Sequence, residues 1–451
     1  MKNQLILAAA AVPDLKVADV DYNTDQIVRL IKENSECGLI VFPELSVTGY
    51  TCADLFGSGL LLEKAQDGMI RIAEATKEYS GLTAIIGVPI RFENNLYNCA
   101  AVISRGNICA IIPKQYIPSY SEFYEGRWFS SGKSLTKRSV RIHGKDIPFG
   151  TDILAEDPES GAVLGIEICE DLWVPDKPST HMCLAGANII ANLSASDELI
   201  GKEEYRRRLV EYQSGSCYCA YVYASAGVGE SSTDLVFSGH TLIGQSGTVL
   251  QEDIFPRCPY VSTGVIDLVR IMYDRRHQNT FENADEDMYR RVIVNIRAFR
   301  TDKASISEMA DLLKELPVVL SKNPFVPSDD RERGERCRKI MRIQANGLAT
   351  RIKATGIYNL VIGISGGLDS TLALLVCAEA RKIVPISNHE SRWNRIELRV
   401  GRPGTEPAAE NAEEAGGANA PFHRGVEPSR TTAAWRRAGT ATAALSAWGM
   451  K

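Results

Sequence analysis

A short apolar segment that ends in a glycine turn places the strongest constraint on how this chain folds. Residues 359–362 read Asn-Leu-Val-Ile, and residues 363–370 read Gly-Ile-Ser-Gly-Gly-Leu-Asp-Ser. This order predicts a buried strand over 359–364, a tight turn at the glycines, and a helix over 371–378. A buried strand of this kind needs parallel neighbours on both edges, so the segment favours an α/β fold.

The same turn can hold a phosphate group. Ser365, Gly366 and Gly367 can direct backbone N–H groups toward one anion, and the following helix adds unpaired amides and a positive dipole end. Asp369 and Ser370 come next, where a carboxylate and a hydroxyl can hold Mg²⁺. A glycine turn can also be purely structural, but the polar residues around this one favour phosphate. The sequence contains no lysine-bearing G-x-x-x-x-G-K-[ST] loop.

Three upstream residues, Glu44, Lys114 and Cys169, each follow an apolar, strand-like run. Rigid scaffolds project polar groups into a common cleft at strand ends. A thiolate can attack a carbonyl carbon, a carboxylate can take the thiol proton and later activate water, and an ammonium can stabilise the oxyanion. The backbone N–H of Glu170 is a candidate second donor to that oxyanion. Each residue alone would more often be an inert thiol or a solvated charge, but the three together predict a nucleophilic site.

In this order and context, the three residues resemble the nitrilase or carbon-nitrogen hydrolase superfamily. Residues 363–370 resemble the SGGxDS loop of the ATP-pyrophosphatases. The combination is similar to the glutamine-dependent NAD⁺ synthetases over roughly residues 1–378, with further matching stretches at 192–196, 221–224, 229–235 and 323–327. That resemblance implies that an amidase half frees ammonia from glutamine. A synthetase half then adds the ammonia to nicotinic acid adenine dinucleotide, after ATP has adenylated its carboxylate.

The resemblance also assigns site residues. Glu122 corresponds to a second glutamate that orients Lys114, and Glu125 is the competing position for this role. Alternatively, Glu122 is a surface-loop glutamate with no catalytic role. Glutamine would be held by Tyr120, Glu170, Trp173, Ser196 and Lys202. ATP and its pyrophosphate would be held by Gly363, Ser365, Gly366, Gly367, Leu368, Asp369 and Ser370. ATP is then a co-substrate and Mg²⁺ the metal at Asp369, whereas the amidase half needs no cofactor.

The expected fold is α/β throughout. Resemblance implies a four-layer αββα nitrilase-like sandwich, which spacing alone cannot distinguish from a doubly wound sheet. The first βα unit of an adenine-nucleotide α-hydrolase-like (Rossmann-like) domain follows it. The expected boundaries are an amidase domain at 1–275, an interdomain connection at 276–325, a synthetase fragment at 326–378 and an aberrant tail at 379–451.

The tail has a different composition from the rest of the chain. Residues 401–451 contain no Ile, one Leu, one Val and one Phe against thirteen Ala, so they can bury little apolar surface. We expect this segment to be disordered, either because the reading frame shifts near residue 378 or because the tail is naturally disordered. In either case the synthetase half is incomplete and its activity doubtful, which leaves a stand-alone carbon-nitrogen hydrolase as the alternative function.

Composition excludes several other classes of protein. The formal net charge of −5 argues against a nucleic-acid surface, and the six histidines form no H-E-x-x-H zinc motif. Eleven scattered cysteines predict reduced thiols in a cytoplasmic enzyme. The apolar run at residues 5–11 is too short for a membrane span, so no membrane partner is expected. Resemblance implies a homo-oligomer if the protein is intact.

Overall fold

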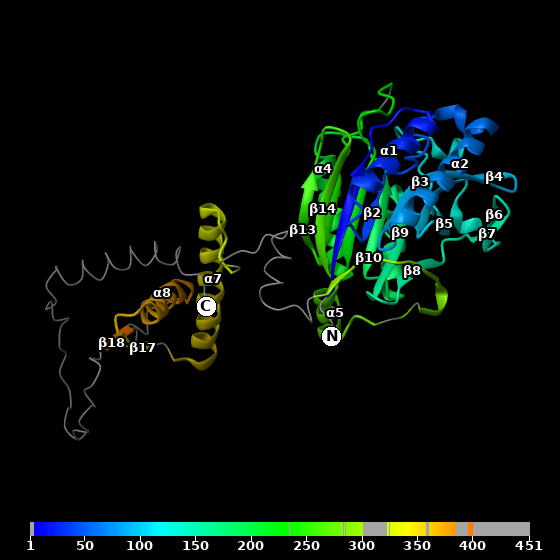
Figure 1. Ribbon diagram of the computed structural model, residues 1–451. Helices are drawn as coiled ribbons and strands as arrows, with labels where there is room; N and C mark the ends of the chain where they lie inside the picture. The colour runs from blue at the N-terminus through cyan, green and yellow to red at the C-terminus, as the bar shows by residue number, and fades with distance from the viewer. Residues whose placement is uncertain are drawn as a thin grey trace, which may run out of the picture. The chain divides into compact units, whose positions relative to one another are not determined.

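The computed structural model describes residues 4–300 apart from 234, 283 and 285, and then residues 323, 325–357, 360–384 and 396–399. The chain divides into two compact units, Met1–Val318 and Val319–Lys451 (Figure 1). The sequence pattern of residues 306–320 predicts a helix, but this segment and most of the tail expected at 379–451 lie outside the described residues.

Two mixed β-sheets form the centre of the first unit (Figure 1), each with seven strands among the described residues. The first sheet has the order β14 (Tyr260–Asp267), β1 (Gln4–Val12), β2 (Leu39–Val41), β3 (Thr83–Phe92), β4 (Asn95–Ser104) and β5 (Asn107–Pro113), with β16 (Phe299–Arg300) paired to β1. The second has the order β13 (Thr248–Asp253), β12 (Thr241–Gln245), β11 (Ala220–Ser225), β10 (Ile189–Ser194), β9 (Ala162–Ile168), β8 (Ile153–Asp157) and β15 (Arg290–Ile293).

Both faces of the central strands are apolar, because each sheet is covered on both sides. In β1, Leu7 and Ala9 face the helical side of the first sheet, whereas Ile6 and Ala8 face the second sheet. This alternation follows from the two-residue repeat of a strand. It explains why the strands in the sequence read as continuous hydrophobic runs, as strands buried on both faces do.

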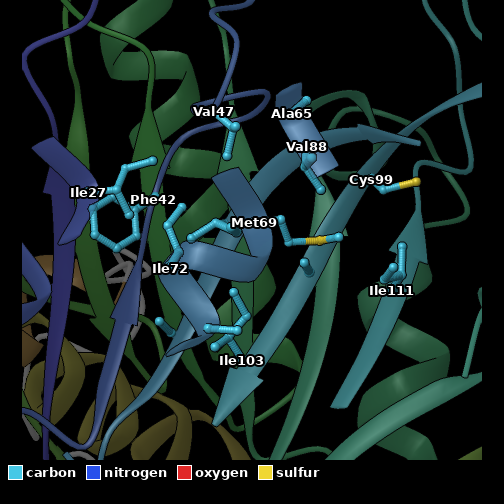
Figure 2. Close-up of a cluster of buried hydrophobic side chains, with 14 of the residues drawn as sticks. Ile27, Phe42, Val47, Ala65, Met69, Ile72, Val88, Cys99, Ile103 and Ile111 are labelled. Carbon is cyan, nitrogen blue, oxygen red and sulfur yellow. The ribbon is translucent and has the colours of Figure 1, made fainter. Parts of the chain in front are cut away.

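Helices cover the outer face of each sheet. On the outer faces lie α1 (Val20–Glu33), α2 (Gly59–Ala75), α3 (Pro178–Leu184) and α4 (Lys202–Ser216), whereas α5 (Leu268–His277) packs Leu268 and Ile271 into the cluster between the sheets. Met69 and Ile72 of α2 pack with Phe42 and Ile103 on the first sheet, as Figure 2 shows from close by. α3 and α4 pack on the outer face of the second sheet through Met182 and Val210. The layers are therefore helix, sheet, sheet, helix, which confirms the predicted αββα sandwich.

Short elements complete the first unit. The hairpin of β6 (Ser139–Ile142) and β7 (Lys145–Pro148) forms a small sheet of its own. The 3₁₀ helices are η1 (Ala53–Gly57), η2 (Thr76–Glu78), η3 (Glu125–Arg127), η4 (Gly132–Ser134), η5 (Cys169–Leu172) and η6 (Glu286–Met288).

The first unit extends beyond the predicted boundary at residue 275. β15 pairs with β8 in parallel, and β16 pairs with β1. Part of the expected interdomain connection at 276–325 therefore completes both sheets. The mixed charge of this segment is typical of a linker. An edge strand can carry the same composition, because its exposed side tolerates polar residues.

The second unit contains α7 (Asp330–Thr355), β17 (Leu360–Gly363), α8 (Leu368–Ile383) and β18 (Ile396–Arg399). α7 begins at Asp330, because the side chain of Asp329 caps it by accepting from the N–H of Glu332 at 2.8 Å. β17, the glycine turn and α8 form the predicted βα unit, but the expectation of a buried strand is wrong for the described residues, because Val361 and Gly363 of β17 are exposed. β18 pairs with β17 in parallel, so the strand has one neighbour that the sequence did not reveal. β18 and the last residues of α8 lie within 379–451, so the start of the segment expected to be disordered has secondary structure.

None of the described helices is both long enough and apolar enough to cross a membrane.

Gly87 on β3 lets the chain after β2 lie directly against the sheet. A Cβ atom at this position would lie 2.1 Å from the backbone nitrogen of Leu45 and 2.5 Å from the carbonyl oxygen of Pro43. The N–H of Val47 donates to the carbonyl of Gly87 at 3.1 Å, which fixes the register of the loop.

We therefore expect Gly87→Ala to lower the free energy of unfolding by about 1–3 kcal/mol, the usual cost of overpacking. Urea unfolding of the full chain, followed by tryptophan fluorescence, measures this change. Gly59→Ala is the matched control, because a Cβ atom at Gly59 meets no atom within 4 Å. Equal unfolding midpoints for the two variants would contradict the close approach.

Candidate active site

Glu44 lies in the loop that follows β2, at the carboxyl end of the parallel part of the first sheet. Its backbone N–H donates to the carbonyl of Ser194 at 3.2 Å, which ties the loop to the end of β10 in the second sheet. The side chain is 1% exposed, and its Oε1 accepts a 2.6 Å hydrogen bond from Asn98 Nδ2. Oε2 has no hydrogen-bond partner among the described residues.

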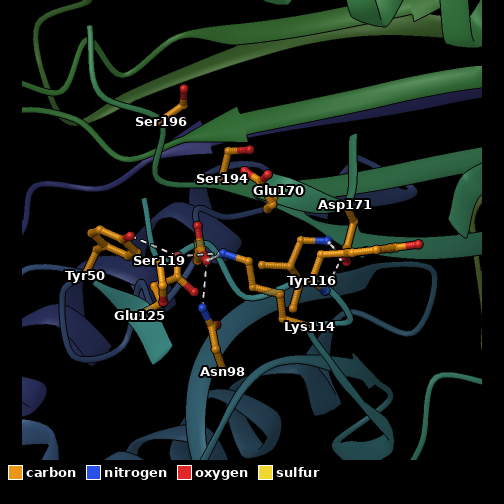
Figure 3. A network of polar contacts seen from close by, with 12 residues as sticks. Tyr50, Asn98, Lys114, Tyr116, Ser119, Glu125, Glu170, Asp171, Ser194 and Ser196 are labelled. Atoms are coloured by element: carbon orange, nitrogen blue, oxygen red, sulfur yellow. Dashed lines mark hydrogen bonds and ion pairs between the residues drawn. The ribbon is translucent and has the colours of Figure 1, made fainter. Parts of the chain in front are cut away.

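Lys114 follows β5 and is fully buried. Its Nζ donates to Glu44 Oε1 and to Glu125 Oε1, both at 2.7 Å (Figure 3). Burial alone lowers the pKa of Lys114, but the carboxylates of Glu125 and Glu44 raise it by more, so its pKa lies well above the usual value. The side chain is therefore a charged ammonium fixed between two acids.

Glu125 begins η3 and is also buried. Its Oε1 accepts from Lys114 and, at 2.9 Å, from the hydroxyl of Tyr50. Burial raises the pKa of Glu125 to about 7, against the lowering effect of Lys114 and of the Tyr50 hydroxyl. Glu125 can therefore change its charge near neutral pH.

Glu122 does not contact Lys114, and the expectation that it orients the lysine is corrected to Glu125. The positive φ of Ser121 (49°) and the bond from the N–H of Glu125 to the carbonyl of Pro118 (3.1 Å) turn Glu125 inward. Glu122 Oε1 instead lies 3.6 Å from Lys202 Nζ. The two acids are three residues apart in a loop, so sequence spacing could not decide between them.

Cys169 follows the last residue of β9 and starts η5 with a left-handed φ of 47°, a conformation that costs energy for a residue with a side chain. The sharp turn brings the thiol toward the other acids and the lysine. Burial and the charge of Glu44 raise the pKa of the Cys169 thiol, whereas Lys114 and the backbone N–H of Ala195 lower it. The net effect is upward, so the resting thiol is protonated and needs a base.

Asp171 connects the turn at Cys169 with the chain after Lys114. Its Oδ2 accepts from the N–H of Ile168 at 3.0 Å, and its Oδ1 accepts from the N–H of Tyr116 at 2.9 Å (Figure 3). Burial raises the pKa of Asp171 to about 7.

Sequence reasoning missed Asp171, Tyr50 and Asn98. Their contacts join segments that lie far apart in the chain, and no local spacing signals them.

Four of the five residues that resemblance assigns to glutamine are at least partly exposed and have described partners, and we call this group, Tyr120, Glu170, Trp173 and Lys202, the mouth of the site. The hydroxyl of Tyr120 donates to Glu170 Oε1 at 3.0 Å. Trp173 stacks on Tyr205 with ring centroids 5.5 Å apart, and Lys202 Nζ lies 5.8 Å from the centroid of the Trp173 ring.

Lys202 is paired with two acids, whereas Ser196 differs from the other four residues in being buried. Asp197 and Glu122 both form ion pairs with Lys202. Ser196 is buried after the end of β10, where its N–H donates to Ser225 Oγ at 3.2 Å. The group carries both charge signs, as a zwitterionic ligand requires.

The phosphate-type turn of the second unit is exposed. Gly366 has a φ of 83°, which favours glycine, and the N–H of Gly367 donates to Ser365 Oγ at 3.4 Å. α8 begins at Leu368, three residues before the predicted start, and Asp369 lies in its first turn. Gly363 and Ser370 flank the same turn.

No group of three His, Cys, Asp or Glu residues in the described chain could hold a metal ion. A magnesium ion at Asp369 would complete its coordination with water molecules, the Ser370 hydroxyl or phosphate oxygens. The open turn at the start of a helix suits a pyrophosphate group.

The first unit thus presents a thiol, an acid with one unpaired oxygen and a fixed ammonium. This set can form and break an acyl bond at a carbonyl carbon.

Comparison with known proteins identifies the family to which the chain is similar. The profile of the carbon-nitrogen hydrolase family matches residues 7–254. The chain is 36% identical over 381 residues to a glutamine-dependent NAD(+) synthetase of Mycobacterium tuberculosis, which covers 83% of this chain and 55% of that protein. It is 28% identical over 374 residues to the protein of the same name from Aquifex aeolicus, covering 81% and 57%.

A solved structure of a glutamine-dependent NAD(+) synthetase from Cytophaga hutchinsonii shares the fold. Its TM-score is 0.52 at 23% identity, and the match covers 83% of this chain and 51% of that one. The chain spans about half the length of the curated relatives it matches.

The geometry predicts different effects for the two neighbouring glutamates. Glu125→Gln removes a counter-charge from the buried ammonium, so we expect the kcat of amide hydrolysis to fall by ~10²–10³. Glu122→Gln changes only the partner of Lys202, so we expect a raised KM and a kcat within about threefold of the parent. Steady-state kinetics of both variants check this. A larger loss of kcat in Glu122→Gln than in Glu125→Gln would restore the original assignment.

Proposed function

This chain belongs to the carbon-nitrogen hydrolase family, and from that premise we propose that its first unit hydrolyses the side-chain amide of glutamine to glutamate and ammonia. One observation carries this function. The ammonium of Lys114 is buried between Glu44 and Glu125, and the charges of all three act on the thiol of Cys169. Burying a charge is costly unless it is paired, so a buried lysine held by two acids is unlike an ordinary surface salt bridge and favours a role in the chemistry.

The first step forms an acyl-enzyme. Oε2 of Glu44, which has no partner among the described residues, takes the proton of the Cys169 thiol as the sulfur attacks the amide carbon. The amide oxygen becomes an oxyanion, and the ammonium of Lys114 stabilises it together with the backbone N–H of Glu170. The carbon–nitrogen bond then breaks, and the proton held by Glu44 goes to the nitrogen, which leaves as ammonia.

The second step releases glutamate. Glu44, again ionised, takes a proton from a water molecule, and the hydroxide attacks the thioester carbon. The carbon–sulfur bond breaks, and the thiolate of Cys169 takes the proton back from Glu44. Glu125 keeps Lys114 in place in both steps. When Glu44 carries the proton it no longer attracts the ammonium as a charge, and the bond from Lys114 to Glu125 then holds the lysine.

The mouth of the site supports glutamine as the substrate. The carboxylate of Glu170, ordered by the Tyr120 hydroxyl, suits the α-ammonium group of glutamine. Lys202 suits the α-carboxylate, and Trp173 and Ser196 would contact the rest of the ligand. Two opposite charges at fixed positions orient the amide toward the thiol.

The ammonia would serve NAD⁺ synthesis. Relatives at 36% identity carry the name glutamine-dependent NAD(+) synthetase, and the second unit has the turn that would hold the pyrophosphate of ATP, with Mg²⁺ at Asp369. ATP would adenylate the carboxylate of nicotinic acid adenine dinucleotide and release pyrophosphate. Ammonia would then displace AMP to form the amide.

Cys169→Ala separates the two reactions. We expect this variant to lose glutamate release and glutamine-supported NAD⁺ formation, because no other thiol or hydroxyl occupies the position of the nucleophile. NAD⁺ formation supported by ammonium chloride does not need the thiol, so its rate should be the same in the variant and the parent chain; because residues 401–451 can bury little apolar surface, we expect that rate to be low in both. Glutamate assays and NAD⁺ assays on both proteins measure the outcome.

Each of the two measurements, glutamate release and NAD⁺ formation from ammonium, has an outcome that would contradict part of the proposal. Full glutamate release from Cys169→Ala would refute the nucleophile. Glutamate release by the parent without any NAD⁺ from ammonium would leave a stand-alone hydrolase.

A further inference from the structure

We propose that Glu230 is a positioning residue of the amidase site, which acts through Tyr50 on the pair of Glu125 and Lys114. The inference rests on the proposed glutamine hydrolysis. Glu230 lies in the connection between β11 and β12, far in sequence from the other site residues.

The carboxylate of Glu230 clamps two consecutive residues of the chain after Glu44. Its Oε1 accepts from the N–H of Tyr50 at 2.7 Å, and its Oε2 accepts from the N–H and the hydroxyl of Thr51 at 2.9 and 2.5 Å. The N–H of Ser231 donates back to the Thr51 hydroxyl at 2.8 Å. Glu230 forms no ion pair with any described residue, so the carboxylate relies on these donors.

A second contact from the same connection fixes the ring of Tyr50. The ring meets Phe237 edge-on, with centroids 5.9 Å apart, and Phe237 is buried. Glu230 therefore holds the backbone of Tyr50 while Phe237 holds its ring. The backbone and the ring of Tyr50 are thus both held in the arrangement in which its hydroxyl donates to Glu125 Oε1 at 2.9 Å.

The hydroxyl of Tyr50 determines how readily Glu125 stays ionised. A hydrogen bond donated to a carboxylate favours the charged form and lowers the pKa. Burial has already raised the pKa of Glu125 to about 7, so a modest further rise would make it neutral at physiological pH. Lys114 would then have one counter-charge in place of two, and its position beside Cys169 would depend on Glu44 alone.

A clamp that only stabilises the fold would behave differently. Asp157 gives the comparison, because it is a buried carboxylate that accepts from two backbone N–H groups, those of Glu159 and Ser160, both at 3.2 Å. It lies at the end of β8 and forms no bond with the residues of the site. Its removal should cost stability without affecting Glu125.

The test is the titration of Glu125 in the full chain. Carbon-13 NMR of chain labelled at glutamate carboxyl carbons follows each resonance with pH, and Glu125→Gln assigns the signal. Glu230→Gln and Tyr50→Phe should each raise the titration midpoint by about one pH unit, since a hydrogen bond to a charged group corresponds to about that shift. The double variant should shift no further than either single one, and Asp157→Asn should leave the midpoint unchanged.

The pH dependence of glutamine turnover is the second readout. The acid limb of kcat should move to higher pH by the same amount in Glu230→Gln and Tyr50→Phe, because the ionised form of Glu125 is the active one. If Glu230→Gln does not fold, Thr51→Val removes one donor of the clamp and should give a smaller shift in the same direction.

The outcomes distinguish the two claims. An unchanged Glu125 midpoint in Glu230→Gln, or additive shifts in the double variant, would overturn the role of Glu230. A shifted midpoint in a chain that hydrolyses no glutamine would support that role and refute the proposed function.

Discussion

The buried ammonium of Lys114 is the interaction on which the rest of the site depends. A fully buried lysine without counter-charges would lose its proton or destabilise the fold, and removing one partner of a buried pair typically costs about 3–5 kcal/mol. Glu44 and Glu125 each supply a carboxylate oxygen at 2.7 Å. Three segments that are distant in sequence must therefore meet at one point, and the sandwich provides the meeting place (Figure 3).

The two sheets bring those segments together because their strands end at a common edge. Glu44 follows β2 and Lys114 follows β5 in the first sheet, whereas Cys169 follows β9 in the second. The bond from Glu44 N–H to the carbonyl of Ser194 and the bonds of Asp171 fix the ends of the strands relative to one another. Geometry set by the rigid scaffold thus decides which acids and which thiol share a cleft.

Much of this arrangement could be predicted from the sequence. Apolar runs gave the strands, and the residues at their ends gave Glu44, Lys114 and Cys169. The choice between Glu122 and Glu125 could not be made, because it depends on one left-handed residue, Ser121, inside a loop. Tyr50, Asn98 and Glu230 were equally hidden, since their contacts span 54 to 180 positions of the chain. β15 and β16 were hidden because edge strands carry mixed polarity.

The formation of an acyl-enzyme on Cys169 tests the central claim most directly. Full-length protein mixed with glutamine and quenched rapidly in acid can be digested and analysed by mass spectrometry, peptide by peptide. We expect a glutamyl adduct on the peptide that contains Cys169 and on none of the other ten cysteines of the eleven in the chain. Rapid glutamate release with no adduct on Cys169, or with an adduct on a different cysteine, would contradict it.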